Sequence, residues 1–259
     1  MRALGAIAEA LGDSKIGLIG VPKTIDNDIG LVDKTFGFET AVAVAKDAID
    51  AAHTEASSVS NGIGLVKLMG RDAGFIAAQA TLASRDVNVC LIPEAPHRLE
   101  GPGGLLDHLE QRLSRRGHAV VVVAEGCGKA LATKSKAPRD PSGNVRFASE
   151  ELDIGTHLKR RIEAHFKSKG APCTLKYIDP SYMIRGVPAN ATDAVFCDDL
   201  ARAAAHAAMA GKTRVMIGRC HRVFTHVPLA LVLLEKKRID PRGDLWLAVI
   251  EATGQPEYV

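Results

Sequence analysis

Short apolar runs alternate with segments of helical periodicity along most of the chain. The run 120–123, four consecutive valines, has the composition of a buried strand, whereas Ala45, Ile49 and Ala52 recur at helical spacing. Strands are predicted over residues 16–21, 63–69, 87–93, 118–125, 175–178, 215–218 and 229–234. Helices are predicted over residues 1–12, 41–52, 72–84, 103–115, 150–169 and 193–210. This alternation is typical of an α/β protein with parallel, helix-covered sheets.

Two segments depart from this rhythm. The interval 127–148 contains glycine, lysine, proline, arginine and aspartate in place of periodic apolar residues, so we predict a mobile surface loop there. Residues 1–12 form a short amphipathic pattern with charge near both ends, and the chain has no apolar run of 18 residues. The sequence therefore predicts neither a signal peptide nor a membrane span.

Composition narrows the class of partner. With 259 residues, 46% of them hydrophobic, the chain can bury a sizeable core as one large domain or two lobes. The net charge of +3 and the scattered lysines and arginines argue against a nucleic-acid surface and favour a small-molecule partner. Five cysteines, an odd number with no C-x-x-C pair, indicate reduced thiols in an intracellular protein. The expected location is the cytoplasm, with a plastid as the alternative.

Polar clusters follow four of the predicted strands. The segment 22–29, Pro-Lys-Thr-Ile-Asp-Asn-Asp-Ile, comes directly after the run 16–21. Met69-Gly70-Arg71, Glu125 and the segment 182–185, Tyr-Met-Ile-Arg, come after later strands. Ligands of α/β sheets bind at the carboxyl ends of the strands, so we expect one site built from several loops on one sheet edge.

These motifs resemble those of the 6-phosphofructokinases. The residues that carry the resemblance are 22–29, 36–41, 61–64 with 69–71, 124–126 and 179–185. The five motifs stand in the family's order, cover nearly the whole chain and are most similar to the plant-type, ATP-dependent branch, which shares this pattern with pyrophosphate-dependent relatives. The resemblance implies a two-lobe architecture. Approximate bounds are 1–35 with 191–225 for the phosphoryl-donor lobe, and 36–190 with 226–259 for the sugar-phosphate lobe. The family's upstream glycine-rich donor loop has no counterpart here, so we expect the first lobe to be incomplete, as in a shortened gene product.

The resemblance also implies a reaction, in which ATP phosphorylates the 1-hydroxyl of fructose 6-phosphate with Mg²⁺ to give fructose 1,6-bisphosphate. Asp26 would accept the hydroxyl proton, Asp28 would place the metal and Lys23 would contact the donor phosphates. Arg71, the second residue expected to be catalytic, would hold phosphoryl oxygens through its planar guanidinium. The implied substrate-binding residues are Thr24, Ile25, Asp26, Met69, Gly70, Arg71, Glu125, Tyr182, Met183, Ile184 and Arg185.

Three alternatives stay open at this point. Pyrophosphate could replace ATP as the donor, because Lys23 accompanies both donors in this family. A non-catalytic sugar-phosphate-binding or regulatory subunit would keep the substrate motifs without the donor loop. An inert truncation product would bind nothing. The family resemblance further suggests a homo-oligomer, and no nucleic-acid or membrane partner is expected.

Overall fold

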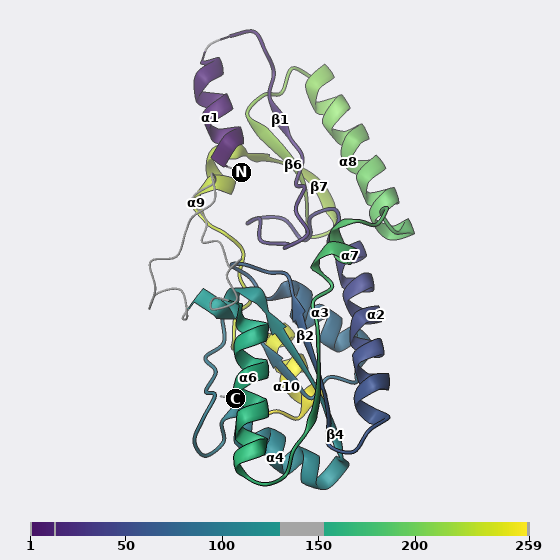
Figure 1. Cartoon of the computed structure of the whole chain (residues 1–259). Helices are drawn as coiled ribbons and strands as arrows, with labels where there is room; N and C mark the ends of the chain where they lie inside the picture. Colours follow the sequence, from purple (N-terminus) through teal and green to yellow (C-terminus); the bar gives the residue numbers. More distant parts are fainter. Residues whose placement is uncertain (1, 13, 130–152, 258–259) are drawn as a thin grey trace. The chain divides into compact units, whose positions relative to one another are not determined.

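The computed structural model describes residues 2–12, 14–129 and 153–257, which form two compact units. The first unit consists of Met1–Ala41 and Val187–Arg238, and the second of Val42–Gly186 and Ile239–Val259 (Figure 1). The expected division differs from this one in its boundaries. In particular, residues 226–238 were expected in the second lobe and belong to the first unit.

A four-stranded parallel sheet forms the centre of the second unit. Its strands are β2 (Gly62–Leu68), β3 (Val89–Leu91), β4 (His118–Ala124) and β5 (Thr174–Ile178), in the order β3-β4-β2-β5. The helices of this unit are α2 (Phe38–Ser57, starting in the first unit), α3 (Phe75–Ser84), α4 (Leu105–Arg116), α6 (Ile154–Ser168), α7 (Ser181–Arg185) and α10 (Asp244–Thr253), with a short 3₁₀ turn at Glu125–Gly128. The predicted parallel, helix-covered sheet is confirmed here, because all three strand pairs are parallel.

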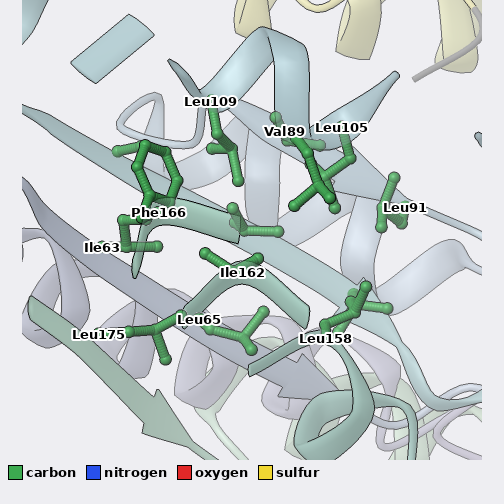
Figure 2. Packing of buried hydrophobic residues seen from close by; sticks show 14 of the residues in the cluster. Ile63, Leu65, Val89, Leu91, Leu105, Leu109, Leu158, Ile162, Phe166 and Leu175 are labelled. Atoms are coloured by element: carbon green, nitrogen blue, oxygen red, sulfur yellow. The ribbon is translucent and has the colours of Figure 1, made fainter. Parts of the chain in front are cut away.

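One face of this sheet packs against α4 and α6. Residues in alternate positions of the strands, such as Ile63 and Leu65, meet Leu109 of α4 and Ile162 and Phe166 of α6 in one buried cluster (Figure 2). Burying each such side chain contributes about 1.5–3 kcal/mol. This cluster holds the strand ends in fixed register, so the loops that follow them start from a rigid base.

On the opposite face of the sheet, α2 packs closely against β2. A Cβ added to Gly64 of β2 would lie 2.8 Å from the carbonyl oxygen of Ala52, so no larger residue fits between strand and helix. Ala45, Ile49 and Ala52 are fully buried, which confirms the predicted apolar face of this helix. Helix α10 packs on α3 and β3.

The first unit contains a smaller, mixed sheet in the order β1-β6-β7. Its strands are β1 (Ile19–Gly20), β6 (Val215–Cys220) and β7 (Val223–Pro228), and its helices are α1 (Arg2–Leu11), α8 (Ala191–Met209) and α9 (Leu229–Leu234). Strand β1 pairs with β6 in parallel, while β6 and β7 form an antiparallel hairpin. Phe196 and Leu200 of α8 pack against Ile217 of β6.

The sequence predictions fail mainly around this hairpin. The run 229–234 was predicted as a strand and forms α9, because a short leucine- and alanine-rich run has no period that separates the two, and leucine and alanine favour helices. Strand β7 was not predicted, and its antiparallel pairing departs from the all-parallel expectation. Most of the predicted loop 127–148 lies outside the described residues.

The cysteines and the apolar helices were also the subject of sequence predictions. All five cysteines are free thiols, and Cys90 and Cys127 are buried. Within the residues that the structure describes, no helix is long and apolar enough to cross a membrane.

Candidate functional site

In the first unit, the loop that follows β1 carries five of the predicted site residues. Thr24 and Asp26 are adjacent in space, since the Asp26 amide donates to Thr24 Oγ1 at 3.2 Å. Thr35 closes the loop by donating its hydroxyl to the Thr24 carbonyl at 2.5 Å and its amide to Asn27 Oδ1 at 3.2 Å. Asn27 adopts a positive φ of 53° and is 5% exposed, so it is part of the loop's interior. The loop is therefore an ordered turn in which the buried Asn27 stands between Asp26 and Asp28 in the sequence.

The carboxylate of Asp28 has a cationic neighbour. Lys236 Nζ lies 3.2 Å from Asp28 Oδ2, and the Asp28 side chain is 16% exposed. Lys23 is exposed at the start of the loop, while Ile25 and Asp26 are half-buried. The loop thus combines two carboxylates with the exposed Lys23, and the accessible Lys236 lies beside it.

In the second unit, three predicted clusters follow neighbouring parallel strands. Leu68 at the end of β2 pairs with Ala124 at the end of β4, and Val66 pairs with Ile178 at the end of β5. Residues 69–71, 125 and 179–185 therefore emerge at the same edge of one sheet. The expected assembly of loops at a sheet edge is confirmed for these three clusters. The fourth, the Asp26 loop, follows β1 and belongs to the other sheet, so the expectation of a single edge was wrong for it.

Arg71 and Glu125 are the charged pair of this edge. Arg71 Nε lies 3.7 Å from Glu125 Oε1, and their side chains are 38% and 19% exposed. Burial raises the pKa of Glu125 above its ordinary value, although the positive charge of Arg71 opposes this. Gly70 has a φ of 132°, and its carbonyl accepts the Gly126 amide at 3.0 Å, which ties the two loops together. The edge thus offers a guanidinium and a carboxylate side by side.

The short helix α7 carries the last predicted cluster. Tyr182 is 94% exposed and Met183 is 63% exposed, and Arg185 also lies at the surface. Ile184 is 3% exposed and Met69 is also buried, so a ligand could meet these two residues only through their backbone. Within α7, the side chains accessible to a ligand are those of Tyr182, Met183 and Arg185.

A charge network that the sequence did not predict supports this edge. Lys67 Nζ lies 2.6 Å from Asp153 Oδ1 and 2.8 Å from Asp179 Oδ2, and the Lys67 side chain is 14% exposed. Asp153 caps α6 by accepting the Thr156 amide at 2.9 Å, and it also accepts the Tyr177 hydroxyl at 3.0 Å. A lysine inside the otherwise apolar run 63–68 was the available signal, because a charged residue in a buried strand needs partners. Lys67 therefore links β2, α6 and the start of the α7 motif.

Carboxylate, imidazole and thiol groups are the side chains that could hold a cation. In the described parts of the chain, no three His, Cys, Asp or Glu side chains gather closely enough to hold a metal ion by themselves. Mg²⁺ is nevertheless bound in many proteins by one or two carboxylates together with waters and substrate phosphates. The Asp28 carboxylate fits that mode of binding, in which the protein supplies only part of the coordination shell.

Comparison with known proteins identifies the class. The family model described as "Phosphofructokinase" matches residues 2–208, and the chain belongs to this family. The fold agrees with this assignment. The structure of a pyrophosphate-dependent phosphofructokinase from Marinobacter aquaeolei matches with a TM-score of 0.70, covering 93% of this chain and 60% of that one at 23% identity.

Relatives with higher sequence identity carry a more specific name. The ATP-dependent 6-phosphofructokinase of Borreliella burgdorferi is 48% identical over 248 residues, which are 93% of this chain and 55% of the relative. The ATP-dependent 6-phosphofructokinase 2 of Arabidopsis thaliana is 48% identical over 94% of this chain and 55% of its own length. The chain thus spans about half the length of the curated relatives it matches.

Proposed function

We propose that the chain transfers the terminal phosphoryl group of ATP to the 1-hydroxyl of fructose 6-phosphate, giving fructose 1,6-bisphosphate. The observation that carries this proposal is the 48% identity, over 93% of this chain, to a protein named ATP-dependent 6-phosphofructokinase. In this proposal the first unit belongs to the phosphoryl-donor lobe and the second unit binds the sugar phosphate.

The loop after β1 supplies the proton acceptor. Asp26 takes the proton of the 1-hydroxyl as the oxygen attacks the donor phosphorus, a role worth about 10²–10⁴ in rate for a well-placed general base. Thr24, whose hydroxyl already accepts the Asp26 amide, contacts the sugar phosphate together with the Ile25 backbone. Asp28 would hold Mg²⁺, which would supply neutralisation of the donor phosphates, and Lys23 binds the oxygens of these phosphates.

The sheet edge of the second unit supplies the substrate anchors. Arg71 can direct two N–H donors at phosphoryl or sugar-phosphate oxygens. Glu125 accepts hydrogen bonds from sugar hydroxyls, and the positive charge of Arg71 favours its ionised form against the burial that raises its pKa. Arg185, with Tyr182 beside it on α7, clamps the 6-phosphate. The backbones of Met69, Gly70, Met183 and Ile184 line the same site.

The proposal also names ATP, rather than pyrophosphate, as the phosphoryl donor. Both named donors occur among similar proteins, but the pyrophosphate-dependent structures are only 22–23% identical to this chain and support the fold alone. The ATP-dependent relatives are about twice as similar in sequence. We therefore expect ATP. We also expect a homo-oligomer located in the cytoplasm or, as in the chloroplastic relatives, in a plastid.

Two substitutions test the roles. Asp26→Asn should lower turnover by at least about 10²-fold while the dissociation constant for fructose 6-phosphate changes less than about twofold. Arg185→Ala should weaken fructose 6-phosphate binding about 10- to 100-fold, since it removes charge-assisted hydrogen bonds. Arg202→Ala, which removes an exposed arginine paired with Asp198 and Asp199, is the matched control and should leave binding unchanged. Normal turnover in Asp26→Asn would remove Asp26 as the base.

A non-catalytic role has a distinct outcome. A sugar-phosphate-binding or regulatory subunit would bind fructose 6-phosphate in a titration calorimeter and yield no product with either donor. In that case Arg185→Ala would still weaken binding, whereas Asp26→Asn would have no measurable effect.

A further inference from the structure

The segment 235–237 lies alongside the Asp26 loop within the first unit. Ile29 and Lys236 form an antiparallel bridge, and the Lys237 amide donates to the Asp28 carbonyl at 3.0 Å. The approach is close, because a Cβ added to Gly30 would lie 2.7 Å from the Glu235 carbonyl oxygen. The backbone of residues 235–237 therefore borders the loop that carries both candidate carboxylates.

The ammonium group of Lys237 binds three acceptors of that loop. Its Nζ donates to Asn27 Oδ1 at 3.0 Å, to the Val32 carbonyl at 3.1 Å and to the Asp33 carbonyl at 2.9 Å. An ammonium has three N–H donors, so the geometry supplies one acceptor for each. Lys237, which is 210 residues from Asn27 in the sequence, therefore bridges Asn27 to the backbone of residues 32–33.

Asn27 is the residue through which this contact reaches the carboxylates. It stands between Asp26 and Asp28, its φ is 53°, and its side chain is buried. Its Oδ1 accepts from both Lys237 and the Thr35 amide. A rotation of the Asn27 backbone would turn the peptide units on both sides, and with them the two carboxylates.

The cost of burial indicates how much Lys237 depends on these acceptors. Burial lowers the pKa of Lys237 to about 8, although the negative charges of Asp33 and Asp28 oppose this. The three hydrogen bonds of Lys237 Nζ replace the water that burial removes. Transfer of a charge out of water without such partners is strongly unfavourable.

We propose that Lys237 is a positioning residue for phosphoryl transfer, because its ammonium fixes Asn27 and thereby the orientation of Asp26 and Asp28. The catalytic part of this inference rests on the proposed function. The ordering of the loop does not, since it concerns the chain without ligands.

Hydrogen exchange of the ligand-free chain tests the ordering. Lys237→Met keeps the length of the side chain and removes its donors, so exchange of the amides in residues 27–35 should accelerate about 10- to 100-fold, as expected for lost hydrogen bonds to a charged group. Amides in the interior of α8 and β6 should keep their exchange rates. Arg238→Met, which removes the exposed charge next along the chain, is the matched control and should change nothing.

Two results would overturn the proposal. Unchanged exchange in residues 27–35 would mean that the loop is ordered without Lys237. Equal acceleration in α8 and β6 would mean that Lys237 supports folding of the unit in general. If Lys237→Met does not fold, Asn27→Gly provides a second test, because glycine accepts a φ of 53° and loses the acceptor that Lys237 and the Thr35 amide share. Asn27→Asp, which keeps acceptor oxygens at this position, is its control. Local acceleration in Asn27→Gly but not in Asn27→Asp supports the proposal, and equal or unchanged exchange in both contradicts it.

Kinetics test the catalytic part separately. In the active chain, Lys237→Met should lower kcat about 10-fold or more while the KM for fructose 6-phosphate stays within about twofold, because the misplaced groups act in the transition state. A raised KM at unchanged kcat would contradict the proposal. If the unmodified chain has no activity with either donor, the proposed function fails, whereas the exchange experiment still decides whether Lys237 orders the loop.

Discussion

The Lys67 network allows a quantitative prediction. Lys67→Met removes the ammonium between Asp153 and Asp179 and leaves the shape of the side chain almost unchanged. Removing one partner of a buried ion pair costs about 3–5 kcal/mol, because the other charge stays buried without it. Here the value should lie near the lower end. Asp153, 14% exposed, keeps its bonds from Thr156 and Tyr177, while Asp179, 37% exposed, can be solvated by water. We predict a loss of about 3 kcal/mol in the free energy of unfolding.

The chain contains its own probe for this measurement. Trp246, the single tryptophan, is buried in α10 of the same unit, so its fluorescence reports unfolding of that unit in urea. The matched control is Lys176→Met, which breaks an exposed pair with Glu55 at 3.4 Å and should cost less than about 1 kcal/mol. If Lys67→Met is no more destabilised than Lys176→Met, the argument from burial is refuted.

The pH dependence of this loss follows from the pKa shifts. Burial works against the charged form of Lys67, Asp153 and Asp179, but the hydrogen bonds between them outweigh it. The pKa of Lys67 is therefore raised, and the pKa values of the two carboxyl groups are lowered. The carboxylates contribute stability above the unfolded-state pKa of about 3.9 and lose it as the pH falls through their lower folded pKa values. The lysine contributes below about pH 10.4 and loses its contribution at higher pH. The loss in free energy of unfolding caused by Lys67→Met should therefore have its full size near pH 7 and become smaller in strong acid.

Three further predictions concern single residues. Ile162→Ala should cost about 2–5 kcal/mol in the same urea experiment, because the side chain is fully buried between α6 and the sheet; a loss below about 1 kcal/mol would contradict the packing. Arg222→Gly should stabilise the first unit by about 0.5–1 kcal/mol, since Arg222 has a φ of 68° in the β6–β7 turn and its amide bond to Asp33 would remain; a lower melting temperature would count against this. The raised pKa of Glu125 means that its carboxylate is protonated at a higher pH than an ordinary glutamate as the pH falls, and the affinity for fructose 6-phosphate should weaken with that protonation. Glu125→Gln should remove this pH dependence of the affinity, and identical pH profiles of the two proteins would show that Glu125 does not bind the sugar.

Local sequence patterns predicted most elements of the second unit, although α10 was not predicted. The runs that became β2 and β4 are apolar except for Lys67 and His118, as expected for strands covered on both faces. The leucines of α4 recur at helical spacing. The common edge of residues 71 and 125 follows from such a parallel sheet, whereas the strand order β3-β4-β2-β5 was not predicted. The run that became α9 was misassigned because six apolar residues carry too little periodicity.

Contacts between distant segments could not be predicted in this way. The Lys67 network joins residues up to 112 positions apart, from 67 to 179, and the Lys237 contact with Asn27 joins residues 210 positions apart. Lys237 stands in an ordinary charged segment, and nothing in its local sequence distinguishes it from its exposed neighbour Lys236. Only the fold reveals which of these lysines supports the loop.

The most direct test of the account is phosphoryl transfer to fructose 6-phosphate by the purified 259-residue chain with Mg²⁺, with ATP and pyrophosphate assayed in parallel. We predict fructose 1,6-bisphosphate with ATP, lost in Asp26→Asn. Product with pyrophosphate alone would contradict the proposed donor. A folded chain that forms no product with either donor would contradict the proposed catalysis itself.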